Sequence, residues 1–332
     1  MKEISLFILI IASCIACKKQ HATSFYFWET MYEISPIEKK YLDELNVQKL
    51  YVRFFDVDMK NNEAIPIGEI NIKEKNIQQE IIPVVFITND VLKNLDKNKI
   101  EDLAKHIKQE IEFIYPKISD KKIKEIQFDC DWTISTRSKY FYLLNIVEKQ
   151  NPTLLVSATI RLHQIKDKTK TGIPPIKKGV LMYYATSNPL DFKEENSILE
   201  NKLAENYCKE IQNYPIALDI ALPIYSWAII ENQVGEKRLL NGIRNEMLKD
   251  TSIYQPIKPN FYLAKKDHYL HGNYIYEDFT IKTEEVTTTQ LEQASTFLKN
   301  KIINQELNTI FYQLDSSNLS HYSIQNLKNI SK

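Results

Sequence analysis

Two carboxylates, Asp129 and Asp131, lie two residues apart within an apolar segment of the chain. The segment alternates apolar and polar residues from Ile126 to Thr133. This alternation is typical of a β-strand, whose successive side chains point to opposite faces, so both carboxylates would share one face. Their Cα atoms would then be roughly 6.5–7 Å apart, and one charge could raise the pKa of the other carboxyl. The pair is either solvated or part of a site with acid–base chemistry.

Eight strand-like segments alternate with helix-like segments along the 332-residue chain. They are residues 24–30, 49–58, 80–89, 125–133, 154–164, 178–186, 215–227 and 309–315. Apolar residues at helical spacing from Ile100 to Ile114 predict an amphipathic helix, and a long helix is expected over 197–213. Such alternation implies an α/β fold with a parallel sheet, and eight units predict a single closed (β/α)8 TIM-like barrel over residues 24–332. An open doubly wound sheet is the alternative.

Two insertions interrupt the predicted barrel. Residues 59–75 are expected to form a loop or hairpin after the second strand. Residues 230–286, rich in tyrosine and charge, are expected to form a helix plus hairpin between the seventh and eighth strands.

Polar and aromatic residues gather where the predicted strands end. In a (β/α)8 barrel the active site lies at the C-terminal ends of the strands, which makes these residues candidates. Besides Asp129 and Asp131 they are Trp28, Glu29, Arg53, Asp56, Arg161, Tyr183, Tyr184, Tyr225, Trp227, Gln313 and Asp315. A strand-end aspartate can equally cap a helix, and a single aromatic residue can equally be packing. The gathering at one end is what indicates a site.

Carboxylates beside aromatic platforms are the composition of a sugar site. Cleavage of a glycosidic bond needs one carboxylic acid to protonate the leaving oxygen and a second carboxylate opposite it. We expect Asp131 and Asp129 to be the central carboxylates, with Glu29, Asp56 or Asp315 as the acid. A carbohydrate-binding barrel without catalysis is the second hypothesis, and an envelope-anchored protein-binding scaffold is the third.

Composition argues against several other classes. With 43 basic and 43 acidic residues the chain has no net charge, which gives no support for a nucleic-acid partner. It has six glycines and no glycine-rich phosphate-binding motif. His268 and His271 are three residues apart, but no cluster of cysteine or glutamate accompanies them. We therefore expect no cofactor and no metal, a monomer, and a glycan as the ligand.

The first 17 residues are predicted to be an export signal. An apolar run from Leu6 to Ala12 is too short to span a bilayer, and Cys14 and Cys17 follow it. The segment resembles a bacterial lipobox, in which Cys14, or alternatively Cys17, would carry the lipid. Residues 18–23 would then be a tether, and the protein would be lipid-anchored to a membrane of the bacterial cell envelope. An ordinary cleaved signal is the other interpretation.

The segment from Phe128 to Thr133 resembles the fourth-strand signature of family 18 glycoside hydrolases, Asp-x-x-Asp-x-Asp-x-Glu. Residues 182–184 (MYY) and 223–227 (PIYSW) resemble the sixth and seventh strand ends of the same group. Thr133 stands where that family has its acid glutamate. The resemblance implies a TIM barrel that acts on a glycan.

A closer resemblance covers most of the chain after residue 17. It is to a family of bacterial lipoproteins that have a glycoside-hydrolase-like barrel and no established activity. The matching motifs are residues 127–131 (QFDCD), 156–159 (VSAT) and 222–225 (LPIY). This resemblance implies the barrel fold and the lipid anchor.

Overall fold

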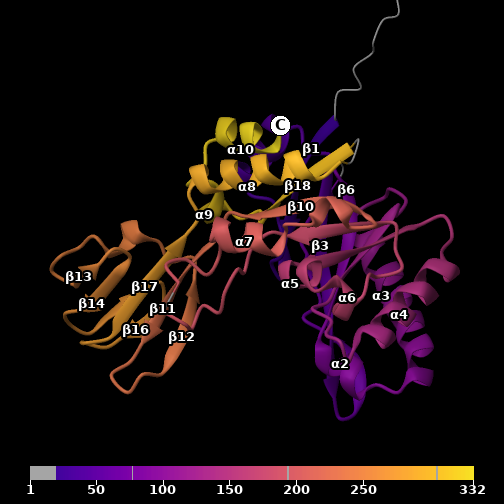
Figure 1. Cartoon of the computed structure of the whole chain (residues 1–332), viewed down its shortest axis with the longest axis horizontal. Helices are drawn as coiled ribbons and strands as arrows, with labels where there is room; N and C mark the ends of the chain where they lie inside the picture. The colour runs from indigo at the N-terminus through magenta and orange to yellow at the C-terminus, as the bar shows by residue number, and fades with distance from the viewer. Residues whose placement is uncertain (1–19, 77, 193, 304–305) are drawn as a thin grey trace, which may run out of the picture.

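The computed structural model describes residues 20–76, 78–192, 194–303 and 306–332. The predicted signal segment, with Cys14 and Cys17, lies outside these residues. Within them, eight parallel strands form a closed barrel, because β1 pairs with both β3 and β18. The barrel strands are, in order around the barrel, β1 (Gln20–Phe27), β3 (Lys49–Lys60), β6 (Glu80–Ile87), β7 (Glu125–Asp129), β8 (Leu155–Arg161), β9 (Lys178–Met182), β10 (Ala217–Pro223) and β18 (Glu306–Tyr312). The predicted (β/α)8 barrel is confirmed (Figure 1).

The first barrel strand begins earlier than expected. β1 begins at Gln20, inside the segment predicted to be a tether. Its register with β18 runs from Gln20 opposite Glu306 to Phe25 opposite Phe311, so the backbone of residues 20–23 is paired in the sheet. Pairing across the barrel, which no local pattern reveals, extends the strand.

Helices cover the outside of the barrel (Figure 1). They are α1 (Pro36–Glu44), α2 (Asn89–Asn94), α3 (Ile100–Ile118), α4 (Arg137–Gln150), α5 (Leu162–Lys166), α6 (Lys168–Thr171), α7 (Asn201–Tyr207), α8 (Thr288–Lys301), α9 (Ser316–Leu319) and α10 (Ile324–Ser331), with 3-10 turns η1 (Lys97–Lys99), η2 (Ile211–Asn213) and η3 (Asn245–Leu248). The predicted apolar stripe of α3 is buried from Ile100 to Ile114. The helix expected over 197–213 is shorter: Glu200 caps the first turn of α7, and the separate 3-10 turn η2 follows its end. No described helix has the length and apolar content needed to cross a membrane.

Two insertions extend from the barrel, one after β3 and one between β10 and β18. The first forms a hairpin, in which β4 (Glu63–Ile67) pairs antiparallel with β3, and the short strands β2 (Met31–Tyr32) and β5 (Asn71–Ile72) pair beside it. The second forms a five-stranded sheet in the order β12-β11-β17-β14-β13, beside the barrel in Figure 1. Its strands are β11 (Ser226–Glu231), β12 (Lys237–Asn241), β13 (Tyr254–Lys258), β14 (Phe261–Ala264) and β17 (Thr280–Glu285), and β15 (His268–Leu270) pairs separately with β16 (Asn273–Ile275).

The expected helix of the second insertion is wrong: among its described residues only the 3-10 turn η3 is helical. The reason is a period-two pattern, seen in β11, where Ala228 and Ile230 enter a small separate core. The sheet also begins at Ser226, within the segment predicted to belong to the seventh barrel strand.

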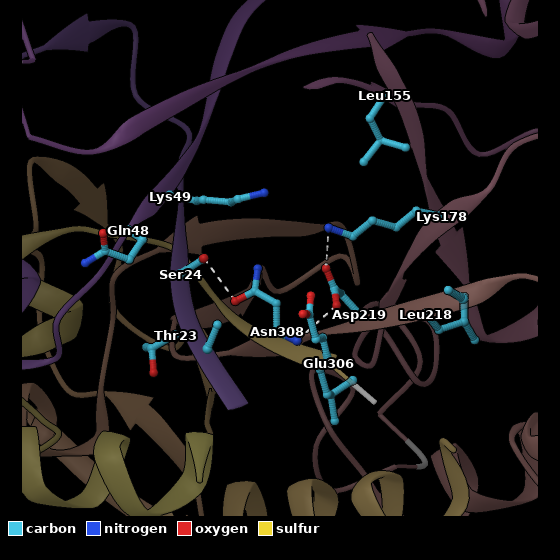
Figure 2. Close-up of a pocket in the computed structure, with 13 residues that line it drawn as sticks. Thr23, Ser24, Gln48, Lys49, Leu155, Lys178, Leu218, Asp219, Glu306 and Asn308 are labelled. Carbon is cyan, nitrogen blue, oxygen red and sulfur yellow. Dashed lines mark hydrogen bonds and ion pairs between the residues drawn. The ribbon is translucent and has the colours of Figure 1, made fainter. Parts of the chain in front are cut away.

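Charged side chains pair at the N-terminal mouth of the barrel, where Figure 2 shows Lys178 and Asp219 pointing toward each other. The Lys178 ammonium lies 2.7 Å from Asp219 and 3.6 Å from Glu125, and both carboxylates are buried. Asp219 also accepts from the Asn308 backbone N–H, and Ser157 donates to Glu125. A cavity of about 560 Å³ lies here. Because its charged groups pair with one another, and because it lies opposite the strand ends that carry the candidate residues, we assign this mouth a structural role.

Candidate functional site

A cavity of about 710 Å³ opens at the C-terminal mouth of the barrel. It brings together most of the residues that the sequence predicted for a site. These are Trp28, Arg53, Asp56, Asp129, Arg161, Tyr184, Tyr225, Trp227, Gln313 and Asp315. Their elements are far apart in the chain, and closure of the barrel is what places them around one opening.

One wall of the cavity is a cluster of aromatic rings around Tyr312. The ring centroid of Tyr312 lies 5.8 Å from Trp28, 5.5 Å from Tyr184 and 5.7 Å from Tyr225. Tyr225 in turn lies 5.3 Å from Trp227. Rings packed against one another present stiff apolar faces at low entropic cost, which suits a flat ligand such as a sugar ring.

Tyr183 does not join this wall. It is fully buried, and its ring lies 6.4 Å from that of Phe297 in α8, outside the barrel. Side chains at the end of a strand alternate between faces, so when Tyr184 points inward Tyr183 points toward the helices. The prediction of Tyr183 as a substrate-binding residue is therefore corrected.

Asp129 lies at the base of the cavity and is buried. It accepts hydrogen bonds from the Thr159 hydroxyl, at 2.6 Å, and from the Arg161 guanidinium, at 2.9 Å. These two hydrogen bonds hold the Asp129 carboxyl in one orientation at the cavity.

Asp131 lies outside the strand and is not among the residues that line the cavity. β7 ends at Asp129, so the strand predicted to continue to Thr133 is too long. The side chain of Asp131 is 55% exposed and lies 3.4 Å from His163. Asp131 still acts on Arg161. Burial lowers the pKa of the Arg161 guanidinium, but electrostatic interactions, first with Asp129 and also with Asp131, raise it above its ordinary value. The structure does not bring Asp131 to the cavity wall, and its catalytic role stays a prediction.

The burial of Trp132 explains where the chain goes after β7. Its ring is fully buried and stacks on Tyr140 at 5.3 Å, and its indole N–H donates to the Thr171 carbonyl. The chain then enters a turn in which the Thr133 hydroxyl is 2.9 Å from that of Ser135. Thr133 is exposed and does not line the cavity.

Arg53 and Asp56 line the cavity as an ion pair. The Nε and Nη2 atoms of Arg53 donate to the two carboxylate oxygens of Asp56, at 2.7 and 2.6 Å. This two-pronged geometry occupies both oxygens of Asp56. Gly68 in the adjacent hairpin packs against the pair, since a Cβ there would lie 2.7 Å from Nη2 of Arg53. The ion pair therefore fixes the positions of both side chains in the cavity wall.

Glu29 is exposed and is not among the residues that line the cavity, but its carboxyl is hydrogen-bonded to that of Asp315, which does line it. Asp315 lines it and caps α9, accepting from the backbone N–H groups of Ser317 and Asn318. Burial raises the pKa of Asp315. The hydrogen bonds from Ser317, Asn318 and Glu29 outweigh burial and lower this pKa below its ordinary value. Burial, the hydrogen bond to Asp315 and the charge of Asp315 raise the pKa of Glu29 to about 7. Below about pH 7 Glu29 therefore carries a proton beside the charged Asp315.

The structure adds lining residues that sequence reasoning missed. They are Phe86, Ser226, Asn241, Gly242, His271, Tyr312, Ser317 and Asn318. Tyr312 could have been found as an aromatic residue at the end of the last strand. Asn241, Gly242 and His271 come from the second insertion, and no local signal links them to the barrel.

His271 was considered as a metal ligand together with His268. In the structure His271 joins the cavity wall, whereas His268 packs edge-on against Tyr254, with ring centroids 4.9 Å apart. Across the part of the chain that the structure describes, no group of three or more His, Cys, Asp or Glu side chains is placed to hold a metal ion.

Comparison with solved structures finds folds of the same kind. The spore cortex-lytic enzyme SleL of Bacillus cereus has a TM-score of 0.58 at 12% identity, over 94% of this chain and 74% of that chain. A chitinase from Bacteroides thetaiotaomicron has a TM-score of 0.56 at 11% identity, over 94% of this chain and 96% of that one. A class V chitinase from Nicotiana tobaccum has a TM-score of 0.55 at 10% identity, over 94% and 98%.

Identities this low establish a shared fold and nothing finer. No model of a protein family matches the chain. No curated protein matches it either. These enzymes thus share the closed (β/α)8 barrel fold of this chain.

We expect the Glu29 carboxyl to titrate with a midpoint near 7, well above its ordinary value of 4.5. In the Asp315→Asn variant this midpoint should fall, because the neighbouring negative charge is gone while the burial remains. Carbon-13 NMR of the glutamate carboxyls, with Glu29→Gln to assign the signal, measures both. A midpoint of about 4.5 in the unmodified protein would contradict the raised pKa of Glu29.

Proposed function

We propose that the protein binds a glycan in the cavity at the C-terminal mouth and hydrolyses a glycosidic bond there. The observation that carries the proposal is the aromatic wall around Tyr312 beside carboxyl groups in two different environments. Asp129 is paired with a guanidinium, whereas Glu29 is hydrogen-bonded to Asp315. Glycosidic cleavage uses two carboxyls in different environments, and the raised pKa of Glu29 suits one of them to act as the acid. The fold that the chain shares with chitinases supports the same proposal, and the tobacco enzyme has been crystallised with NAG4.

In this proposal Glu29 takes the place of the acid that Thr133 cannot supply. Glu29 gives its proton to the leaving oxygen as the glycosidic bond breaks, and water adds to the anomeric carbon. The proton that the water releases restores Glu29, so the sum of the steps is hydrolysis. Asp129 supplies the negative charge that stabilises the oxocarbenium-like transition state. Asp315 keeps the proton on Glu29 until the leaving oxygen takes it.

A non-catalytic carbohydrate-binding barrel is the second candidate. The observation that favours it is the exposed turn at Thr133, which lies away from the cavity where the sequence resemblance would place the acid. The two candidates agree on sugar binding and differ only in turnover.

Sugar binding is tested with the N-acetylglucosamine tetramer by isothermal titration calorimetry. Trp28→Ala should weaken binding about tenfold, which corresponds to ~1.4 kcal/mol, because it removes a ring of the cavity wall. Phe113→Ala is the matched control: this ring is 62% exposed on α3 and does not line the cavity, so affinity should not change. If neither the tetramer nor a wider glycan panel binds, the proposed function is wrong.

Turnover is tested with Glu29→Gln, which removes the proton and keeps the shape. We expect hydrolysis to be lost while the tetramer still binds. In the unmodified protein kcat should fall as the pH rises through about 7, because Glu29 loses its proton there. Asp131→Asn, measured alongside, tests the sequence-based role of Asp131. Binding without turnover in the unmodified protein would establish the second candidate.

We also propose that a lipid on Cys14 or Cys17 anchors the protein to a membrane of the bacterial cell envelope. β1 begins at Gln20 at the N-terminal mouth, a few residues after either cysteine. An anchor there would hold this mouth toward the membrane and leave the sugar cavity facing away from it.

The anchor is tested by metabolic labelling of cells with an alkyne fatty acid. We expect Cys14→Ser to abolish the label and Cys17→Ser to keep it, since Cys14 fits the small-residue pattern of a lipobox better. The reverse result would assign the lipid to Cys17. No label on the unmodified protein would rule the anchor out and favour an ordinary cleaved signal.

A further inference from the structure

Three segments of the chain meet on the buried carboxylate of Glu284 in β17. The Trp227 indole N–H donates to it at 2.8 Å, and the Ser197 backbone N–H donates to it at 3.0 Å. Trp227 and Glu284 are opposite each other in the antiparallel pair β11–β17, so their side chains lie on the same face. Ser197 comes from the connection between β9 and α7. Glu284 thereby joins a barrel connection to the inserted sheet.

Lys282 completes this cluster. Its ammonium is 2.5 Å from the other oxygen of Glu284 and also donates to the carbonyl of Glu194, at 2.7 Å. Both charged side chains are fully buried, and the rings of Phe192 and Phe261 lie 5.4 and 5.8 Å from the ammonium. A buried ion pair in such surroundings adds little stability over apolar side chains of the same size. What the ion pair does provide is a Glu284 carboxylate that accepts hydrogen bonds at a fixed position.

Trp227 is the member of this cluster that reaches the sugar cavity. It lines the cavity and packs against Tyr225, whereas Glu284 does not reach the cavity. A tryptophan whose N–H is held cannot turn about its side-chain bonds, so a ligand that stacks on it does not have to immobilise it. Holding a side chain in its bound orientation increases affinity, because the entropic cost of immobilising it is not incurred on binding.

We propose that Glu284 is a positioning residue that fixes the indole of Trp227 as a wall of the sugar cavity. The inference rests on the proposed sugar binding and adds a determinant of affinity that does not touch the ligand. The indole hydrogen bond is what transmits the effect.

Two double variants isolate that hydrogen bond. Lys282→Met/Glu284→Gln and Lys282→Met/Glu284→Met both remove the ion pair, but only the first keeps a side-chain oxygen that can accept from Trp227. We expect the Gln variant to bind the N-acetylglucosamine tetramer like the unmodified protein and the Met variant to bind about tenfold more weakly. In a Trp227→Phe background, which has no indole N–H, the two variants should bind equally. Equal affinities with Trp227 present would overturn the inference.

A ligand-independent measurement separates this inference from the proposed function. Acrylamide quenching of Trp227, obtained by difference from Trp227→Phe because the chain has three tryptophans, should increase in the Met variant and not in the Gln variant. Equal quenching would overturn the positioning of Trp227 even if the tetramer binds. If quenching is as expected but the tetramer does not bind the unmodified protein, the proposed binding of this sugar is wrong, whereas the positioning of Trp227 by Glu284 is supported.

The Met variant has a matched check on folding. Urea unfolding of both double variants should give cooperative transitions, with the lower midpoint in the Met variant because the Ser197 and Trp227 donors lose their acceptor. If the Met variant does not fold, hydrogen exchange of the Trp227 indole N–H in the unmodified protein replaces it. Slow exchange supports the bond to Glu284, and exchange at the rate of a free indole would overturn it.

Discussion

The pairing of β1 with both β3 and β18 closes the sheet, and the rest of the molecule depends on this closure. The interior of an eight-stranded barrel has room only for side chains, so polar groups that point inward must find partners there. Tyr26 donates to Gln127 at 2.6 Å, and Thr159 donates to Asp129 at the same distance. Closure also places the C-terminal ends of all the strands around one opening, which is where the cavity lies.

The two mouths of the barrel use charge differently. At the N-terminal mouth Lys178 forms ion pairs with Glu125 and Asp219. At the C-terminal mouth each carboxyl meets a different environment: Asp129 lies beside a guanidinium, whereas Glu29 faces another carboxyl. Two like charges close together cannot both ionise easily, so one keeps its proton. The C-terminal mouth is therefore the one where carboxyls in different environments could take part in the acid–base chemistry that we propose.

The acid that we propose for this site cannot be located from motif spacing alone. A motif carried over from another family assumes that its strand continues in the same direction to the last matching residue. Here the burial of Trp132 against Tyr140 ends the strand early, and Thr133 lies in an exposed turn. Glu29 does not line the cavity and is linked to it through Asp315, which is distant from it in the chain. The second insertion also contributes to the cavity through a contact between distant residues, because the Trp227 indole N–H donates to Glu284.

The sequence by itself determined the eight barrel strands, the buried stripe of α3 and the gathering of acids and aromatic residues at one mouth. Alternation and helical spacing are local patterns, and the strand-end rule for barrels turns them into a site. The tertiary structure alone decided which of two adjacent tyrosines faces the cavity, where β7 ends, and that His271 and Tyr312 join the wall. It also decided the pairing of Glu29 with Asp315. These features depend on contacts between residues far apart in the chain, and such contacts form only when the barrel closes and the inserted sheet packs beside it.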